Sequence, residues 1–207
     1  MSSAAEVERR MDVAEFLRWN EEQEERWELV DGFATRMMAG GKHRHNIATS
    51  NVAYAVTAAA RSSGCETTTS DTAVRTGPDR IRYPDVVVNC ADDDLDAHVA
   101  TAPTVLFEVT SPGTEWFDLN DKLDEYRALP SVRQILLISP TRVRVEVHSR
   151  SEGGQWSMRR VDDVDARIEL PSIGARLALR DIYRALDPAP SRHLDVVDED
   201  GSRRKPT

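Results

Sequence analysis

The chain has 207 residues, of which 40% are hydrophobic and 30% charged, and its formal net charge is −9. This length and composition fit one globular domain, which we expect over residues 12–186, between disordered ends at 1–11 and 187–207. The acidic balance argues against a broad basic surface for nucleic acid, although it is compatible with a local basic groove. No apolar stretch approaches the roughly 20 residues that span a bilayer, and the start of the chain lacks the features of a signal peptide. We therefore expect a cytoplasmic protein that does not bind membranes.

Cys65 and Cys90 are the only cysteines in the sequence. They lie far apart, and neither belongs to a paired spacing that would indicate a zinc site. We therefore expect two reduced thiols, packed inside the protein or at the edge of a strand.

The domain is expected to begin with a helix and a hairpin. Asp12 followed by Glu15 is typical of a capping box, and the apolar residues after it predict a short amphipathic helix. The Asp31-Gly32 pair between two apolar runs predicts a β-hairpin. In the first strand of this hairpin Glu28 points away from the face of Trp27 and Leu29, so position alone predicts a solvent-facing side chain.

A long helix and several strands are expected next. An alanine-rich apolar stripe predicts a helix from about His43 to Arg61, packed closely against a sheet. His45 lies in its first turn, where a histidine is more often a cap or a surface residue than a catalytic group. Residues 67–88 predict a run of antiparallel strands with a turn at Gly77-Pro78-Asp79.

Two carboxylates interrupt apolar runs in the centre of the chain. Asp85 precedes the run 86–88, and Glu108 lies inside the run 105–109. Both runs are short and rich in β-branched or aromatic residues, which predicts buried strands. A buried carboxylate loses its hydration, at a cost of several kcal/mol unless a cation or hydrogen-bond donors replace the water. Two such groups on neighbouring strands therefore indicate a shared cation.

Lys122 belongs to the next predicted helix, from about Asp118 to Leu129. It lies on or beside the apolar face, so its ammonium group either extends to solvent or points to an anionic group near the sheet. A buried strand at 134–138, a half-exposed strand at 142–147 and a short helix at 181–186 complete the predicted domain.

The order of these elements resembles the core of the PD-(D/E)XK nuclease superfamily, with Pro84-Asp85 as the first half of its motif and Glu108-Val109-Thr110 as the second. From about residue 12 to residue 186 the chain also resembles the Uma-type restriction endonuclease family, a bacterial family within that superfamily. The stretches that carry the resemblance are Trp27–Gly32, Met38–Gly41 leading to Arg44-His45-Asn46, Ser70-Asp71-Thr72, Tyr83–Val88, Phe107–Pro112, Asp121-Lys122-Leu123 and Tyr126-Arg127.

This resemblance implies a mixed α/β (α+β) fold with a restriction-endonuclease-like core, in which a central mixed β-sheet is flanked by helices. It also implies a Mg²⁺ site formed by Asp85 and Glu108, at which Mn²⁺ is able to substitute.

The resemblance further implies roles for three other residues. The lysine of the superfamily motif is replaced here by Thr110, and the family pattern places it instead on the following helix, at Lys122. Glu28 and His45 also match family positions. Glu28 would complete the metal site or hold Lys122, and His45 would contact the substrate.

The implied function is a Mg²⁺-dependent endonuclease that hydrolyses phosphodiester bonds in DNA. Its catalytic residues would be Asp85, Glu108, Lys122 and Glu28. Arginines on or after the predicted helix are further candidates for phosphate contacts, although a solvated surface role is the commoner one: Arg127, Arg142 and Arg144. Superfamily analogy also suggests a homodimer.

Two alternatives to this function stay open. One is a non-catalytic nucleic-acid- or protein-binding module that retains the nuclease fold, which the acidic net charge favours and the intact trio of Asp85, Glu108 and Lys122 disfavours. The other is a metallohydrolase that acts on a small phosphoester.

Overall fold

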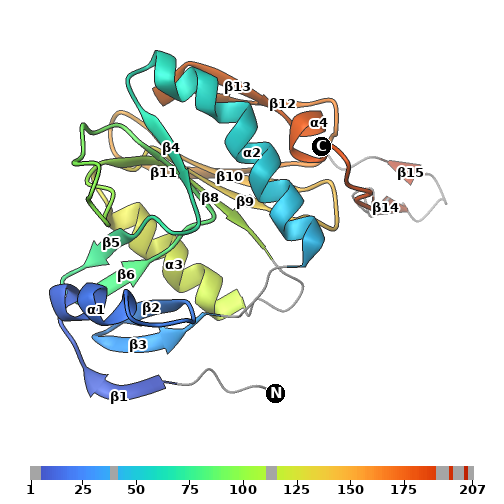
Figure 1. Ribbon diagram of the computed structural model, residues 1–207. Helices are drawn as coiled ribbons and strands as arrows, with labels where there is room; N and C mark the ends of the chain where they lie inside the picture. The colour runs from blue at the N-terminus through green and yellow to red at the C-terminus, as the bar shows by residue number, and fades with distance from the viewer. Residues whose placement is uncertain (1–5, 38–41, 111–115, 190–195, 198–202, 205–207) are drawn as a thin grey trace.

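The computed structural model describes residues 6–37, 42–110, 116–189, 196–197 and 203–204. A six-stranded sheet with the strand order β11-β10-β9-β8-β7-β4 forms its centre, and a five-stranded sheet with the order β1-β3-β2-β6-β5 lies beside it (Figure 1). Strands β8 and β9 pair in parallel, whereas the other neighbours in the large sheet are antiparallel. The predicted central mixed sheet is therefore confirmed.

The large sheet is built from short strands, and those in its middle are buried on both faces. Its members are β4 (Glu66–Thr69), β7 (Val86–Asn89), β8 (Pro103–Val109), β9 (Gln134–Ile138), β10 (Val145–Arg150) and β11 (Trp156–Val161). The smaller sheet contains β1 (Glu6–Arg10), β2 (Trp27–Val30), β3 (Phe33–Arg36), β5 (Val74–Gly77) and β6 (Arg80–Arg82).

Helices cover both faces of the large sheet. Along β8, Phe107 packs on the side of helix α2 (His43–Ser62), whereas its neighbour Leu106 packs on the side of helix α3 (Trp116–Ala128). Helix α3 lies between the large and the small sheet (Figure 1). Side chains on the α3 face of β8 therefore point towards the space where the two sheets meet.

The remaining elements complete the α2 side and the chain ends. The hairpin of β12 (Arg167–Leu170) and β13 (Ala175–Ala178) packs in the core cluster of α2, together with a 3₁₀ turn, η1 (Pro171–Ile173), and helix α4 (Leu179–Ile182). A two-stranded pair, β14 (Val196–Val197) and β15 (Arg203–Arg204), lies in the C-terminal segment.

The first helix and hairpin form as their sequence predicts. Helix α1 (Val13–Asn20) has a complete capping box, in which the Asp12 side chain accepts from the Glu15 amide at 2.8 Å. The hairpin of β2 and β3 turns at Asp31 and Gly32, which have positive φ angles of 51° and 86°. A glycine tolerates such an angle without a steric penalty.

The structure corrects two expectations about the chain ends. Residues 6–10 form β1, which pairs with β3, and Met11 is buried, so the prediction of disorder up to residue 11 is wrong for these residues. At the other end Ala189 exchanges backbone hydrogen bonds with Thr141 and Val143. Much of the expected tail from residue 187, like residues 1–5, lies outside the described residues.

The prediction of two reduced thiols is also wrong for this structure, because Cys65 and Cys90 form a disulfide. The cause is the register of β4 and β7, in which Glu66 lies opposite Asn89 and the two cysteines therefore face each other. Their Cα atoms are 4.1 Å apart.

Some matching stretches of the family motifs, at residues 38–41 and 111–112, lie outside the described residues. Within the described part of the chain, no helix is long and apolar enough to cross a membrane.

Candidate active site

Asp85 and Glu108 lie side by side on neighbouring strands. Val86 in β7 pairs with Phe107 in antiparallel register, which places Asp85, just before β7, opposite Glu108 in β8. Glu108 shares the α3 face of the strand with Leu106, and its Oε1 accepts a hydrogen bond of 2.7 Å from the Tyr126 hydroxyl. The local apolar sequence buries the strands, and their register brings the two carboxylates together.

Asp85 is held by two hydrogen-bond partners. Its Oδ2 accepts from the Val109 amide at 2.7 Å, and its Oδ1 lies 3.0 Å from Nε2 of His45 in the first turn of α2. The hydrogen bond to Asp85 raises the pKa of His45 above its ordinary value, against the lowering effect of burial. His45 therefore contacts a candidate metal ligand directly.

Glu108 experiences a strong shift in its protonation equilibrium. Burial and the nearby negative charge of Asp85 raise its pKa to about 7, although Lys122 acts in the opposite direction. Burial and the neighbouring Glu108 likewise hold the pKa of Tyr126 well above its ordinary value. The pair of carboxylates thus lacks full electrostatic compensation from the protein alone.

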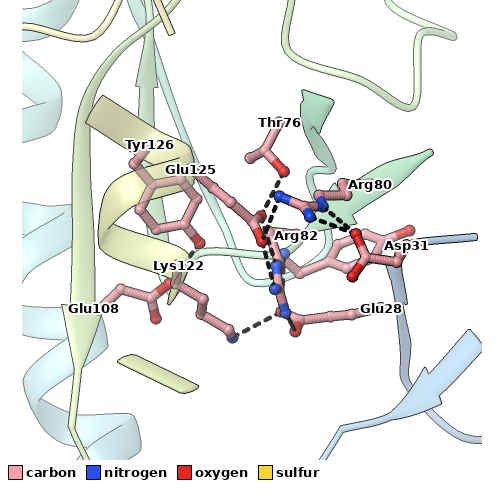
Figure 2. A network of polar contacts seen from close by, with 10 residues as sticks. Glu28, Asp31, Thr76, Arg80, Arg82, Glu108, Lys122, Glu125 and Tyr126 are labelled. Carbon is pink, nitrogen blue, oxygen red and sulfur yellow. Dashed lines mark hydrogen bonds and ion pairs between the residues drawn. The ribbon is translucent and has the colours of Figure 1, made fainter. Parts of the chain in front are cut away.

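Lys122 reaches the same region from α3 and is paired with Glu28 from β2. Its Nζ donates to Glu28 Oε1 at 2.8 Å. Figure 2 shows the two side chains directed towards each other. Burial acts to raise the pKa of Glu28, but Lys122 and Arg82 outweigh it and hold the pKa below its ordinary value. Glu28 is only 6% exposed, so the expectation of a solvent-facing residue is wrong.

Arg82 connects Glu28 to a second buried carboxylate, Glu125. Its Nη1 donates to Glu28 Oε2 at 2.9 Å, while its Nε and Nη2 form a fork with Glu125 at 2.9 and 2.7 Å (Figure 2). Glu125 also accepts from Thr76 Oγ1 at 2.6 Å, and the Tyr83 amide donates to Glu28 at 3.4 Å. This network ties β2, β5, β6 and α3 together.

Arg82, Glu125 and Tyr126 are the site residues that sequence reasoning missed. Tyr126 belongs to a stretch that carries the family resemblance, but no role at the site follows from its sequence. The available signal for Arg82 was its place between the apolar Ile81 and the motif Tyr83-Pro84-Asp85. An arginine that is 3% exposed requires anionic partners, but the sequence does not identify them.

The other candidate residues lie elsewhere or serve local contacts. Thr110, at the position of the superfamily lysine, donates from its hydroxyl to the Ile138 carbonyl at 3.3 Å, on the β9 side. Arg127 contacts Asp124 and His148, and Arg144 pairs with Glu146. Among the described side chains, these arginines have no contact with the carboxylate pair, so phosphate contact at the site is not supported for them.

Asp85 and Glu108 suit a hard divalent cation. Within the described part of the chain, no three His, Cys, Asp or Glu side chains are grouped in a way that could hold an ion alone. Mg²⁺, however, commonly uses one or two carboxylates and keeps several waters. The raised pKa of Glu108 reflects a negative charge that such a cation would compensate. The donor set therefore fits the predicted metal.

Residues 13–180 match the Uma2 family, which is described as "Putative restriction endonuclease". The chain belongs to this family. The resemblance carried by the sequence motifs is therefore confirmed, and Uma2 membership together with the fold supports a nuclease in general terms.

Two relatives and one solved structure are similar to most of this chain. The uncharacterized protein slr1290 of Synechocystis sp. is 30% identical over 86% of this chain and 93% of its own length. The uncharacterized protein sll1609 of the same organism is 28% identical over 77% of this chain and 92% of its own length. A crystal structure from Anabaena variabilis, named a putative nuclease belonging to DUF820, superposes with a TM-score of 0.66 at 20% identity, over 83% of this chain and 97% of that one. This likeness confirms the predicted fold class.

Proposed function

We propose that the chain is a divalent-metal-dependent endonuclease that hydrolyses phosphodiester bonds of DNA. The observation that carries the proposal is the pairing of Asp85 and Glu108 on adjacent strands, with Lys122 directed to the same region from α3. Buried acidic and basic groups are costly to fold, and they concentrate where chemistry requires them.

Asp85 and Glu108 would hold Mg²⁺ through their carboxylate oxygens. The bound ion would lower the pKa of a water molecule and neutralise negative charge on the scissile phosphate. The protein itself orients Asp85 through the Val109 amide and His45, and it orients Glu108 through the Tyr126 hydroxyl. These contacts fix the two carboxylates before a substrate arrives.

Lys122 would supply positive charge to the reacting phosphate. Its Nζ is held 2.8 Å from a Glu28 oxygen, and Lys122 is suited to donate hydrogen bonds to the attacking water and to the developing negative charge. Glu28 then acts by holding Lys122, because both of its oxygens already accept from Lys122 or Arg82. His45, which contacts Asp85 from α2, would contact the substrate.

The test is cleavage of supercoiled plasmid DNA by the purified chain with Mg²⁺, compared with the same reaction in a chelator. Lys122→Ala is expected to lower the rate by about 100-fold or more, because the charge on the phosphate loses a preorganised donor. Arg167→Ala removes an equal charge from an exposed position of β12 and serves as the control.

Cleavage by Lys122→Ala at the wild-type rate would contradict the assignment of this residue. DNA binding by the wild type without any metal-dependent cleavage would favour the non-catalytic binding module instead.

A further inference from the structure

A cleft of about 690 Å³ lies away from the carboxylate pair. Its walls come from the start of β9, the end of β10, β11, β12 and η1, and β12 lies on the α2 side of the large sheet (Figure 1). Three arginines line it, together with polar residues between them: Arg133, Arg150, Arg159, Gln134, Ser149 and Ser172.

The register of the parallel strands separates this cleft from the candidate active site. Gln134 at the start of β9 lies opposite Val105, whereas Glu108 lies opposite Leu137, three residues further along. The Gln134 side chain donates to the Glu169 carbonyl of β12, on the α2 face, whereas Glu108 bonds to Tyr126 on the α3 face. Gln134 and Glu108 therefore point to opposite faces of the sheet, whereas Arg150 at the end of β10 contacts Leu129 and Trp156 of the α3-side cluster. The cleft is separate from the candidate active site because Asp85, Glu108 and Lys122 are not among its lining residues.

Arg150 is fixed in place before any ligand binds. Its Nη1 donates to the carbonyls of Leu129 and Pro130 at 3.0 and 3.3 Å, and its guanidinium lies 5.9 Å from the centre of the Trp156 ring. Its Nε is buried and has no partner among the described residues. A guanidinium held in this way loses little conformational entropy when it binds an anion.

Arg133 and Arg159 add two exposed guanidinium groups, neither of which pairs with a carboxylate in the described part of the chain. Glu169 also lines the cleft, but it is neutralised by Arg176 at 3.1 Å, and the remaining acid is the exposed Glu152. Three arginines in one cleft are notable in a chain of net charge −9. Their planar forks match the geometry of phosphate oxygens.

The cleft also contains uncharged polar atoms that have no hydrogen-bond partner within the described structure. Gln134 is 5% exposed; its Nε2 donates to Ser149 and to the Glu169 carbonyl, and its Oε1 has no partner within the described structure. If the amide oxygen and nitrogen were exchanged, the oxygen would face the Glu169 carbonyl oxygen, and two acceptors cannot form a hydrogen bond. The contact with Glu169 therefore supports the orientation with Nε2 as the donor. The Ser172 hydroxyl is likewise buried without a partner among the described atoms. A ligand with both phosphate and hydrogen-bond donors would satisfy these groups.

We propose that this cleft binds a nucleotide, either free or at the end of a nucleic-acid strand. The phosphate would contact Arg150 and Arg159, and a hydroxyl or amino group of the sugar or base would donate to Gln134 Oε1. The volume of the cleft lies within the range of small-molecule sites. This site is separate from the proposed hydrolysis and does not require it.

The experiment is calorimetric titration of the full chain with 5′-AMP, a 5′-phosphorylated oligonucleotide and inorganic phosphate, all in a chelator. We expect AMP to bind more tightly than phosphate, and Arg159→Ala to weaken AMP by about tenfold. Arg160→Ala is the matched control, since Arg160 follows Arg159 on β11, pairs with Glu146 instead and is also exposed. Both changes remove one surface charge, so neither threatens the fold.

Each outcome decides the proposal. The proposal is supported if Arg159→Ala weakens AMP binding while Arg160→Ala and Glu108→Gln leave it unchanged, because the nucleotide site is then apart from the carboxylate pair. Titration with the oligonucleotide would show whether the end of a strand enters the cleft. Absence of AMP binding, equal binding of AMP and phosphate, or equal losses in the two arginine variants would overturn the proposal. Because no divalent cation is present, these results do not depend on nuclease activity.

Discussion

Glu108 combines burial with a neighbouring negative charge, and its protonation therefore depends on the folded structure. Its pKa of about 7 lies above the ordinary value of 4.5. The folded chain thus binds this proton more tightly than the unfolded chain does. As the pH rises from 4.5 to about 7, the unfolded chain loses this proton while the folded chain still holds it. The free energy of unfolding therefore decreases over this pH range, and the destabilisation by Glu108 is complete above it.

Glu108→Gln is expected to remove this destabilisation, because a neutral amide can still accept from Tyr126 without repelling Asp85. In a chelator, the variant should melt at a higher temperature than the wild type at about pH 8, and the difference should shrink at about pH 5. Differential scanning calorimetry at both pH values measures this. If the difference in melting temperature is the same at both pH values, charge repulsion at Glu108 is not its cause.

At the scale of elements, the arrangement of α3 against the small sheet depends on the network around Arg82. Arg82 and Glu125 are 3% and 8% exposed, so their charges have lost most of their hydration. Breaking a buried ion pair from one side leaves the other charge uncompensated, which costs more than the pair itself contributes.

We expect Glu125→Gln to lower the free energy of unfolding by about 3 kcal/mol, measured by urea denaturation. Asp31→Asn is the control, because the ion pair of Asp31 with Arg80 is largely exposed, and its loss should cost less than about 1 kcal/mol. Similar losses in both variants would mean that the buried network adds nothing beyond ordinary surface electrostatics.

The disulfide connects β4 to β7, the strand that directly follows Asp85. A cross-link restricts the unfolded chain, and the sequence separation of 25 residues corresponds to about 3 kcal/mol in the loop-entropy relation. Cys65→Ser combined with Cys90→Ser should lower the free energy of unfolding by that order under oxidising conditions. In the presence of a reductant, the wild type and the double variant should converge. If the free energies of unfolding of the two proteins still differ in the reductant, the loss of stability comes from packing and not from the cross-link.

At the scale of the whole molecule, the net charge of −9 opposes the approach of DNA. A bound cation at Asp85 and Glu108 would offset part of this repulsion where the phosphate must lie. We therefore expect Ca²⁺ to tighten DNA binding by about tenfold or more relative to a chelator, measured by fluorescence anisotropy at fixed salt.

Asp85→Asn provides the comparison for that measurement. It should lose most of the gain from Ca²⁺ while its affinity in the chelator stays the same or improves slightly, because the variant carries one negative charge fewer. Equal gains in both proteins would place the effect of the cation away from the carboxylate pair.

The sequence by itself determined the features that depend on local chemistry. The capping box of Asp12 and Glu15, the turn at Asp31-Gly32 and the buried strands around Asp85 and Glu108 all follow from neighbouring residues. Local burial patterns are strong because each strand must place its apolar residues in the core. The motifs in these segments were also sufficient for the family, which the match over residues 13–180 confirms.

Only the tertiary structure decided which groups are partners. Glu28 and Lys122 are 94 residues apart, Arg82 and Glu125 are 43 apart, and Cys65 meets Cys90 through strand register. None of these distances is encoded in a local pattern, because side-chain contacts across a fold depend on how helices and sheets dock. The same limit applies to the arginine-lined cleft, whose walls come from separate strands. For this reason the sequence predicts Asp85, Glu108 and Lys122 as candidate site residues, whereas the contacts that position Lys122 depend on how α3 docks against the small sheet.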